Sequence, residues 1–169
     1  FVAEGASAVV IADLNGDAVS AVASEIGAQS FAVDVRDESA IAAMVAAVES
    51  EHGQIDLFCS NAGIIGVDGE PWWATGADNA LWQRMWEIHV TSHVYAARAC
   101  PPSTTARGDG YLLNTASAPG LLAQTGPAPY PVTQHAAVSL AQIHSLPHGA
   151  ASLQIPSPAP HAVHTPIPA

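Results

Sequence analysis

Short apolar runs alternate with longer segments of helical periodicity over the first 146 residues. Four runs are short and almost continuously apolar, as in buried strands, and they occupy residues 7–13, 31–35, 55–60 and 111–116. Longer segments have apolar residues at helical spacing, the pattern of a helix with one buried face, and they occupy residues 15–27, 37–53, 80–100 and 130–146. This alternation predicts an α/β fold, in which a doubly wound parallel sheet lies between two helical layers.

Capping residues mark the ends of the predicted helices. Asn15 and Asp37 precede the first two helices, where their side chains can accept backbone N–H bonds, and Gly27 suits the C-terminal turn of the first. Pro147 is expected to end the last helix. Three prolines within residues 153–160 argue against a regular fifth strand, because proline donates no ladder hydrogen bond.

Composition changes at about residue 100. The first 100 residues hold 14 of the 15 acidic residues, whereas 12 of the 13 prolines and five of the eight histidines come later. A length of 169 residues suits one domain. We therefore predict a single domain over residues 1–169, in which 147–169 form an irregular segment rich in proline and histidine.

Charge argues against two classes of function. The net charge is −11, from 15 acidic residues against four arginines and no lysine. Binding to nucleic acid or to an anionic membrane surface requires cations that this chain lacks. No apolar run approaches the roughly 20 residues of a membrane span, and the two cysteines, Cys59 and Cys100, are too few for a disulfide framework. We expect a cytoplasmic protein with no nucleic-acid or membrane partner.

Polar residues follow the predicted strands at the place where such folds bind ligands, beyond the carboxyl ends. Asp13 can accept both hydroxyls of an adenosine ribose and would repel a 2′-phosphate, which favours NAD(H) over NADP(H). Asp34, with Val35, can reach an adenine amino group. The small residues of Asn61-Ala62-Gly63 let a dinucleotide lie against the backbone. Taken alone, each of these also suits a helix cap, a solvated acid or a plain turn.

Ser117 and Tyr130 are the most informative pair of polar residues. Ser117 follows the fourth predicted strand, and Tyr130 opens the last helix thirteen residues later. A phenol whose pKa is lowered from about 10 can act as an acid toward a carbonyl or as a base toward an alcohol. A serine hydroxyl can bind the reacting oxygen. Taken alone, Ser117 would be interpreted as an ordinary loop serine and Tyr130 as a half-buried tyrosine without a catalytic role.

Together these features resemble the short-chain dehydrogenase/reductase family from Phe1 to about Leu146, with a fainter similarity to Pro166. The resemblance rests on the order and spacing of Asp13, Asp34-Val35, Asn61-Ala62-Gly63, the stretch NTASAPG ending at Gly120, and the Tyr130-x-x-x-Gln134 helix start. It implies a Rossmann-like domain that uses NAD(H) to interconvert alcohols and ketones. In that family Tyr130 would be the acid/base and Ser117 would orient the substrate.

Three departures from the family pattern lower the expected activity. The family's first strand and glycine-rich turn have no match in this sequence. In the family, that strand lies between the two strands that correspond to residues 7–13 and 55–60, so we expect a gap in the sheet at this place. Gln134 stands where the family has a lysine that lowers the tyrosine pKa and holds the nicotinamide ribose. His89 stands where an asparagine supports a proton-relay water. We therefore predict a weak or impaired NAD(H)-dependent dehydrogenase.

A second interpretation is a catalytically inactive relative that serves as a structural or oligomerisation partner. The predicted helices at 80–100 and 130–146 keep apolar faces. The matching helices of the family often pack against their copies, so the resemblance implies a homo-oligomer, a dimer or tetramer. Retained cofactor binding would favour the enzyme, and oligomerisation without it would favour the partner.

A third interpretation, metal binding, rests on histidines near the C-terminus. His144 and His148 are four residues apart, and His161 and His164 follow. Pro147 breaks the helical register of the first pair, and a metal site usually needs three or four convergent ligands. We therefore predict no metal site.

The remaining aromatic residues and the cysteines suit structural roles. The resemblance places the loop that holds Trp72 and Trp73 near the substrate entrance, and the apolar residues 118–124 hint at a hydrophobic alcohol or ketone. Cys59 lies within a predicted strand and is expected in the core.

Overall fold

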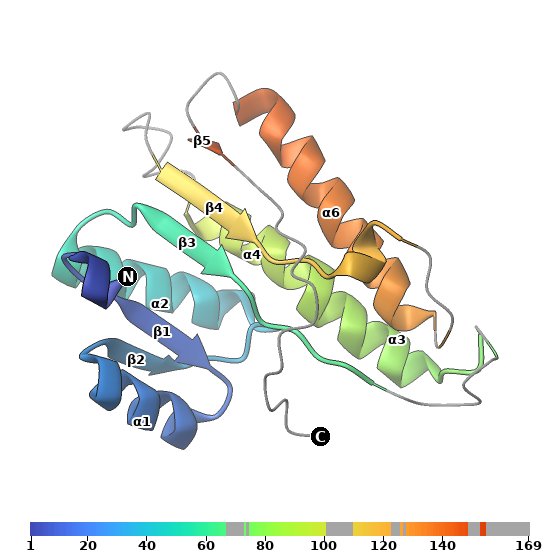
Figure 1. Ribbon diagram of the computed structural model, residues 1–169, viewed down its shortest axis with the longest axis horizontal. Coiled ribbons are helices and arrows are strands. Elements are labelled where there is room, and N and C mark those ends of the chain that lie inside the picture. The colour runs from blue at the N-terminus through green and yellow to red at the C-terminus, as the bar shows by residue number, and fades with distance from the viewer. Residues whose placement is uncertain are drawn as a thin grey trace.

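The computed structural model describes residues 1–66, 73, 75–100, 110–122, 126, 128–148 and 153–154. Strands and helices alternate along these residues, as the apolar pattern predicts (Figure 1). The strands are β1 (Val10–Asp13), β2 (Gln29–Ala32), β3 (Leu57–Ser60), β4 (Gly110–Asn114) and β5 (Leu153–Gln154). The helical elements are η1 (Val2–Glu4), α1 (Gly16–Ile26), α2 (Glu38–His52), α3 (Asn79–Trp86), η2 (Glu87–Thr91), α4 (Ser92–Ala99), η3 (Ala118–Gly120) and α6 (Pro129–His148).

The strands form two separate parallel sheets. β1 pairs with β2, with Val10 opposite Gln29. β3 pairs with β4 and β4 with β5, with Leu57 opposite Tyr111. Within the described residues, no strand joins β1 to β3. The gap expected between these two strands is therefore confirmed.

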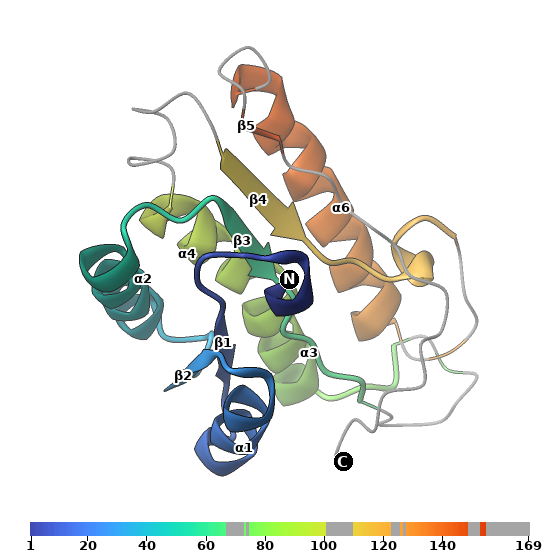
Figure 2. The ribbon, with the colours of Figure 1, turned by 60° about the vertical axis from the view of Figure 1, so that its left-hand side comes forward.

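Helices on both sides of the sheets position the strand ends. α1 lies on one face of β1–β2, where a Cβ on Gly16 would come within 3.2 Å of the Ala32 Cβ. α2 and α4 lie on the other face, and both contribute to a core that contains Val33, Ile41 and Cys100 and contacts Phe58 of β3. Two half-sheets thus rest on one shared helical layer (Figures 1 and 2).

α6 covers β4 on the same side as α4. Leu112 of β4 packs against Ala96 of α4 and Ala141 of α6, and all three are almost fully buried. Leu57 and Tyr111 alternate with these inward residues and remain about 40% exposed. Because successive side chains of a strand point to opposite faces, their exposure shows that no described element covers this face of β3–β4.

Side-chain caps begin the helices as predicted. The Asn15 side chain accepts the Ala18 N–H, and Asp37 accepts the N–H groups of Ser39 and Ala40. Gly27 has a left-handed conformation with φ of 72°, which glycine adopts without steric cost.

The helix predicted over 80–100 is interrupted by a π turn. η2 lies between α3 and α4 without a break in the chain's helical path and contains His89 and Val90. Apolar periodicity over residues 80–100 did not predict this turn.

Three boundary predictions are wrong in detail. β2 ends at Ala32, whereas we expected a strand over 31–35; the Val33 N–H still donates to the Asp13 carbonyl oxygen at 2.9 Å, and the Val33 side chain packs in the core formed with α2. α6 continues past Pro147 to His148, because a proline in the last turn removes only one helical hydrogen bond. A fifth strand does form, although it has only two residues, and most of segment 147–169 lies outside the described residues.

Cys59 corrects a further expectation. Its side chain is exposed, not in the core, because it lies on the uncovered face of β3 beside Leu57. Val22 and Ile26 of α1 are likewise 48% and 39% exposed, although their helical spacing from Val19 and Ala23 is that of an apolar face. In α1, only Val19 and Ala23 are buried.

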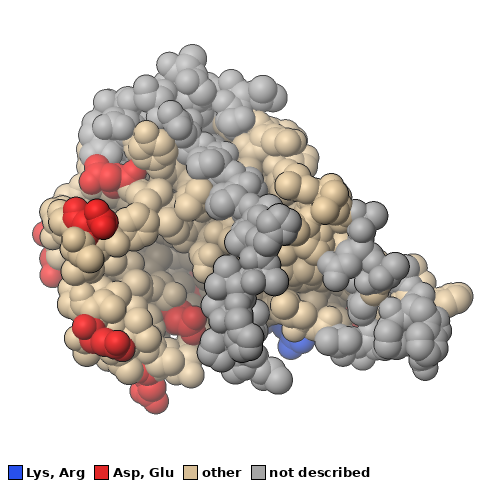
Figure 3. All heavy atoms as spheres, in the orientation of Figure 1, with Lys and Arg blue, Asp and Glu red and all other residues tan. Residues whose placement is uncertain are grey.

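Acidic residues outnumber basic ones in the chain by 15 to 4. Figure 3 shows acidic side chains gathered over the part of the molecule that holds β1, α1 and α2. Among the described helices, none has the length and apolar character needed to cross a membrane. No group of three or more potential metal ligands occurs in the described part of the chain, and His161 and His164 lie outside it.

Candidate active site

The candidate site begins where the parallel strands end. β1, β3 and β4 run in the same direction, so their carboxyl ends lie on one side of the molecule (Figure 1). Asp13 and Asp34 follow the β1–β2 sheet, whereas Asn61 and Ser117 follow the β3–β4 sheet. The predicted binding residues therefore reach one edge of the fold from both half-sheets.

Asp13 is exposed at the end of β1. Its Oδ1 atom accepts a hydrogen bond of 2.8 Å from the Asn15 backbone N–H. This bond orients the carboxylate at the start of α1 and leaves it open to solvent.

Asp34 is held by a neighbouring arginine. The Arg36 guanidinium donates to both carboxylate oxygens, with its Nη2 atom 2.6 Å from Oδ2. These hydrogen bonds hold the pKa of Asp34 below its ordinary value, while partial burial opposes the shift. Val35, predicted beside the cofactor, packs against the core of α2.

Asn61, Ala62 and Gly63 are exposed in the segment that follows β3. A Cβ on Gly63 would lie 3.6 Å from Nε2 of His89, so this segment passes directly along the helix. The Ile64 N–H donates to the same Nε2 atom at 3.0 Å.

Ser117 is tied to α6 by Gln134. The Ser117 backbone N–H donates to Oε1 of Gln134 at 2.8 Å, and Gln134 is only 6% exposed. A Cβ on Gly120 would come within 2.8 Å of the Gln134 carbonyl oxygen. Only glycine allows this close approach of η3 to α6. The geometry thus joins Ser117 and Gln134, which are seventeen residues apart in sequence.

Tyr130 lies one helical turn before Gln134 and is half-buried. Its ring meets the His89 ring edge-on, with centroids 5.6 Å apart and planes at 86°. Tyr130 also contacts the cluster of Ala77, Leu81 and Met85. The tyrosine, His89 and the segment after β3 therefore belong to one packed unit.

His89 is neutral and its two ring nitrogens are both occupied. Since the Ile64 N–H can only donate, Nε2 accepts and the proton lies on Nδ1, which donates to Thr133 Oγ1 at 2.8 Å. Burial lowers the pKa of His89 to about 4. The imidazole bridges the segment after β3 and α6.

His93 is a site residue that the sequence did not reveal. Its Nδ1 atom lies 2.6 Å from Oγ of Ser60, and both side chains are buried. Burial lowers the pKa of His93 to about 4, and the nearby His89 and His144 add to the shift. A second histidine four residues after His89 was the available signal, because residues at i and i+4 share a helix face.

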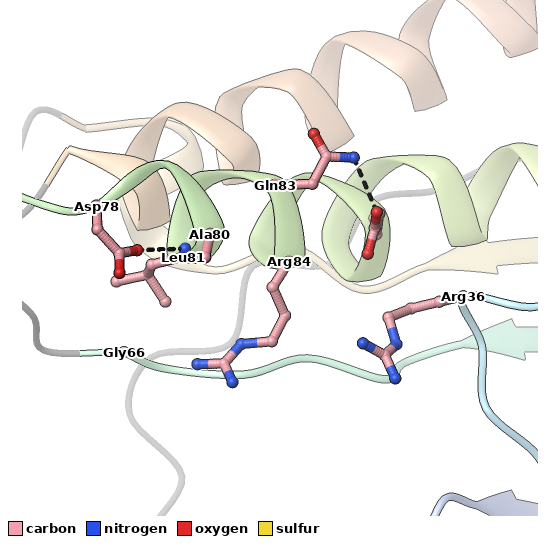
Figure 4. A pocket seen from close by; sticks show the side chains of 8 residues that line it. Arg36, Gly66, Asp78, Ala80, Leu81, Gln83 and Arg84 are labelled. Atoms are coloured by element: carbon pink, nitrogen blue, oxygen red, sulfur yellow. Dashed lines mark hydrogen bonds between the residues drawn. The ribbon is translucent and has the colours of Figure 1, made fainter.

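A cavity of about 580 Å³ lies beside this unit (Figure 4). It runs between Gly66 and α3 and receives the side chains of Arg36 and Arg84. Its lining comprises Arg36, Gly66, Asp78, Ala80, Leu81, Gln83, Arg84 and Glu87. Ser117, Tyr130 and Gln134 do not line it, so it neighbours the predicted catalytic residues without containing them. Trp73 is 62% exposed, and Trp72 lies outside the described residues.

The whole chain matches a known protein family. Residues 1–169 match the family described as enoyl-(acyl carrier protein) reductase. The chain is a short-chain dehydrogenase/reductase. Its similarity to 1-deoxy-11-beta-hydroxypentalenate dehydrogenase of Streptomyces exfoliatus is 32% identity over 146 residues, which covers 83% of this chain and 52% of that relative. Meso-2,3-butanediol dehydrogenase of Serratia marcescens is 33% identical over 168 residues, which covers 98% and 64% of the two chains.

Solved structures of other proteins share the fold. An NAD+-bound xylitol dehydrogenase superposes with a TM-score of 0.85 at 24% identity, covering 94% of this chain and 62% of that one. A metagenomic short-chain oxidoreductase in complex with NADP gives 0.80 at 23% identity, covering 92% and 72% of the two chains. These likenesses confirm the Rossmann-type α/β fold. The short-chain dehydrogenase/reductase chain spans about half the length of the pentalenate relatives.

Proposed function

We propose that this chain is an NAD(H)-dependent oxidoreductase that interconverts an alcohol and a ketone, with impaired turnover. Membership of a family of dehydrogenases supports the reaction class. The observation that carries the proposal is the joining of Ser117 to Gln134 beside Tyr130, because it unites the predicted catalytic residues on one side of α6. We further propose a single domain over residues 1–169 and a cytoplasmic location, which the two thiols, Cys59 and Cys100, suit.

The exposed polar groups at the strand ends fit a nicotinamide dinucleotide. Asp13 presents a solvent-accessible carboxylate suited to ribose hydroxyls. Asn61, Ala62 and Gly63 expose a small-residue backbone. Family members with NAD+ and with NADP are both among the solved structures, so the preference for NAD(H) rests on the charge of Asp13 alone. When bound, the dinucleotide would donate or accept the hydride.

Side chains of the chain itself would handle the proton. In alcohol oxidation, the Tyr130 phenolate would take the proton of the substrate hydroxyl, and in the reverse direction its O–H would return the proton to the ketone oxygen. Ser117 would donate a hydrogen bond to the same oxygen. Gln134 would hold the Ser117 backbone in place through the 2.8 Å bond.

Two features support slow turnover. The chain has no lysine, so no ammonium group can lower the pKa of the Tyr130 phenol. His89 has both ring nitrogens bonded to protein groups, and the imidazole therefore has no free nitrogen to hold a relay water. Each pKa unit by which the phenol misses its working range costs about 1.4 kcal/mol of driving force.

NADH titration into this chain by calorimetry tests the proposal. We expect micromolar binding that Asp13→Ala abolishes, while Asp17→Ala, another acid nearby in α1, leaves it intact. A screen of hydrophobic alcohols and ketones should then show turnover that Tyr130→Phe removes. A folded sample that binds no NADH would overturn the proposal.

A structural role is a second candidate. Val132 and Ile143 leave apolar surface on the outer side of α6, at 44% and 59% exposure, and Trp86 does so on α3. Such a surface suits packing against a second copy through the helices at 80–100 and 130–146. Light scattering that finds a dimer or tetramer without NADH binding would favour this role over the enzyme.

A further inference from the structure

α3, η2 and α4 form one continuous helical run, and one face of this run packs along the segment that follows β3. His93 contacts Ser60, and His89 contacts Gly63 and Ile64. Further toward the start of α3, Met85 and Leu81 lie so close to Gly66 that an added Cβ would approach them to 3.0 and 2.6 Å. Residues 81, 85, 89 and 93 thus line the stretch from Ser60 to Gly66 in antiparallel order.

The π turn aligns these contacts. In an uninterrupted α-helix of 3.6 residues per turn, a side chain twelve residues on is rotated by about 120° from the first. The extra residue of a π turn removes about 100° of this rotation. η2 lies between Met85 and His93 and therefore brings His93 back to within roughly 20° of the line through Leu81.

The two histidines make different bonds within this line. His89 accepts the Ile64 N–H and is itself fixed by Thr133 of α6. Thr133 in turn lies within 2.8 Å of the Pro129 carbonyl oxygen. His93 bonds the Ser60 hydroxyl at the last residue of β3. Between these two anchors lie the three exposed residues Asn61, Ala62 and Gly63.

We propose that His89 and His93 are positioning residues that clamp the segment Ser60–Ile64 at both ends and so preorganise the backbone that faces the dinucleotide. This inference rests on the proposed function for the role of residues 61–63. The clamp itself rests on the two hydrogen bonds and on the π turn that aligns them. Both imidazoles are buried, and Tyr130 and His144 of α6 are the titratable groups that the structure places against them.

A first experiment tests the clamp without any cofactor. We expect amide hydrogen exchange at Ile64 to be at least about tenfold slower than at Ala62 and Gly63, because only Ile64 donates to a buried nitrogen. His89→Phe, which keeps a ring without its nitrogens, should remove this protection, while His89→Gln should retain part of it. Nitrogen NMR of the His89 imidazole should show a proton on Nδ1 at pH 5.5.

A second experiment tests the consequence for binding. Ser60→Ala and His93→Ala should each weaken NADH binding by roughly five- to tenfold, and the double variant should be no worse than either alone, because both remove the same bond. Ser92→Ala is the matched control, since its hydroxyl bonds the Ile88 carbonyl within the helix. A merely structural role would lower Tm and leave Kd unchanged.

The outcomes separate the clamp from the proposed function. Rapid exchange at Ile64 in the unmodified chain would overturn the clamp whatever NADH does. If the Ile64 amide is protected but NADH does not bind, the two hydrogen bonds of the clamp stand, whereas the proposed function and the preorganising role of the clamp are both overturned. An unchanged Kd in folded Ser60→Ala would overturn that preorganising role alone.

Discussion

At the scale of single residues, Gln134 is the most consequential side chain. Its Oε1 atom holds the Ser117 backbone, and it stands one turn from Tyr130 where the family has a lysine. An amide can position a loop, but it contributes no charge to the phenol. In the proposed enzyme, this one residue would therefore preserve the arrangement of the site while removing part of its chemistry.

Gln134→Lys should raise turnover at the expense of stability. A cation beside Tyr130 lowers the phenol pKa, so we expect kcat at pH 7 to rise by about tenfold or more. The buried position and the lost bond to Ser117 should lower the free energy of unfolding by about 1–3 kcal/mol. Steady-state kinetics and urea denaturation measure the two effects. Gln134→Met is the uncharged control, and equal kcat in both variants would contradict the electrostatic argument.

At the scale of elements, neighbouring residues determine where a helix begins better than they determine where a strand begins and ends. Asn15, Asp37 and Asp78 each accept backbone N–H groups at a helix start. The strands are shorter than their apolar runs, since β1 begins at Val10 and β2 ends at Ala32. A cap acts within four residues, whereas a strand extends only as far as a partner pairs with it.

Asn15→Ala should destabilise α1 measurably. The Asn15 side chain accepts the Ala18 N–H at 3.0 Å, and an alanine would leave that donor to water. We expect the free energy of unfolding to fall by about 1 kcal/mol. Urea denaturation followed by circular dichroism measures it, with Asn15→Ser as the variant that should keep most of the stability. Equal losses in both variants would show that the cap contributes nothing.

At the scale of the whole molecule, two half-sheets share one helical layer. The core that contains Val33, Cys100 and Phe58 extends from β2 to β3 through α2 and α4. In the described residues no strand fills the space between β1 and β3. The uncovered face leaves Leu57, Cys59 and Tyr111 exposed, whereas on the other face Ser60 and Leu112 are buried and Phe58 is partly buried.

The two cysteines should differ in their reactivity, because one lies on the uncovered face and the other in the core. Cys59 is exposed, although partial burial raises the pKa of its thiol. Cys100 is 4% exposed, and burial raises the pKa of its thiol to about 12. A thiol reagent at pH 8 should label Cys59 in the folded protein and Cys100 only after unfolding. Cys59→Ser should abolish labelling of the folded protein, and equal labelling rates for both thiols would contradict the uncovered face.

The sequence by itself determined the alternation of strands and helices, the caps at Asn15 and Asp37, and the family to which the chain belongs. These properties depend on neighbouring residues or on motifs at fixed spacing, which one chain displays directly. Only the tertiary structure decided that Cys59 is exposed, that the Gln134 side chain accepts the Ser117 N–H, and that the His93 imidazole bonds the Ser60 hydroxyl. Those outcomes depend on which residues from distant segments meet across the sheet and the π turn, and no local pattern encodes such distances.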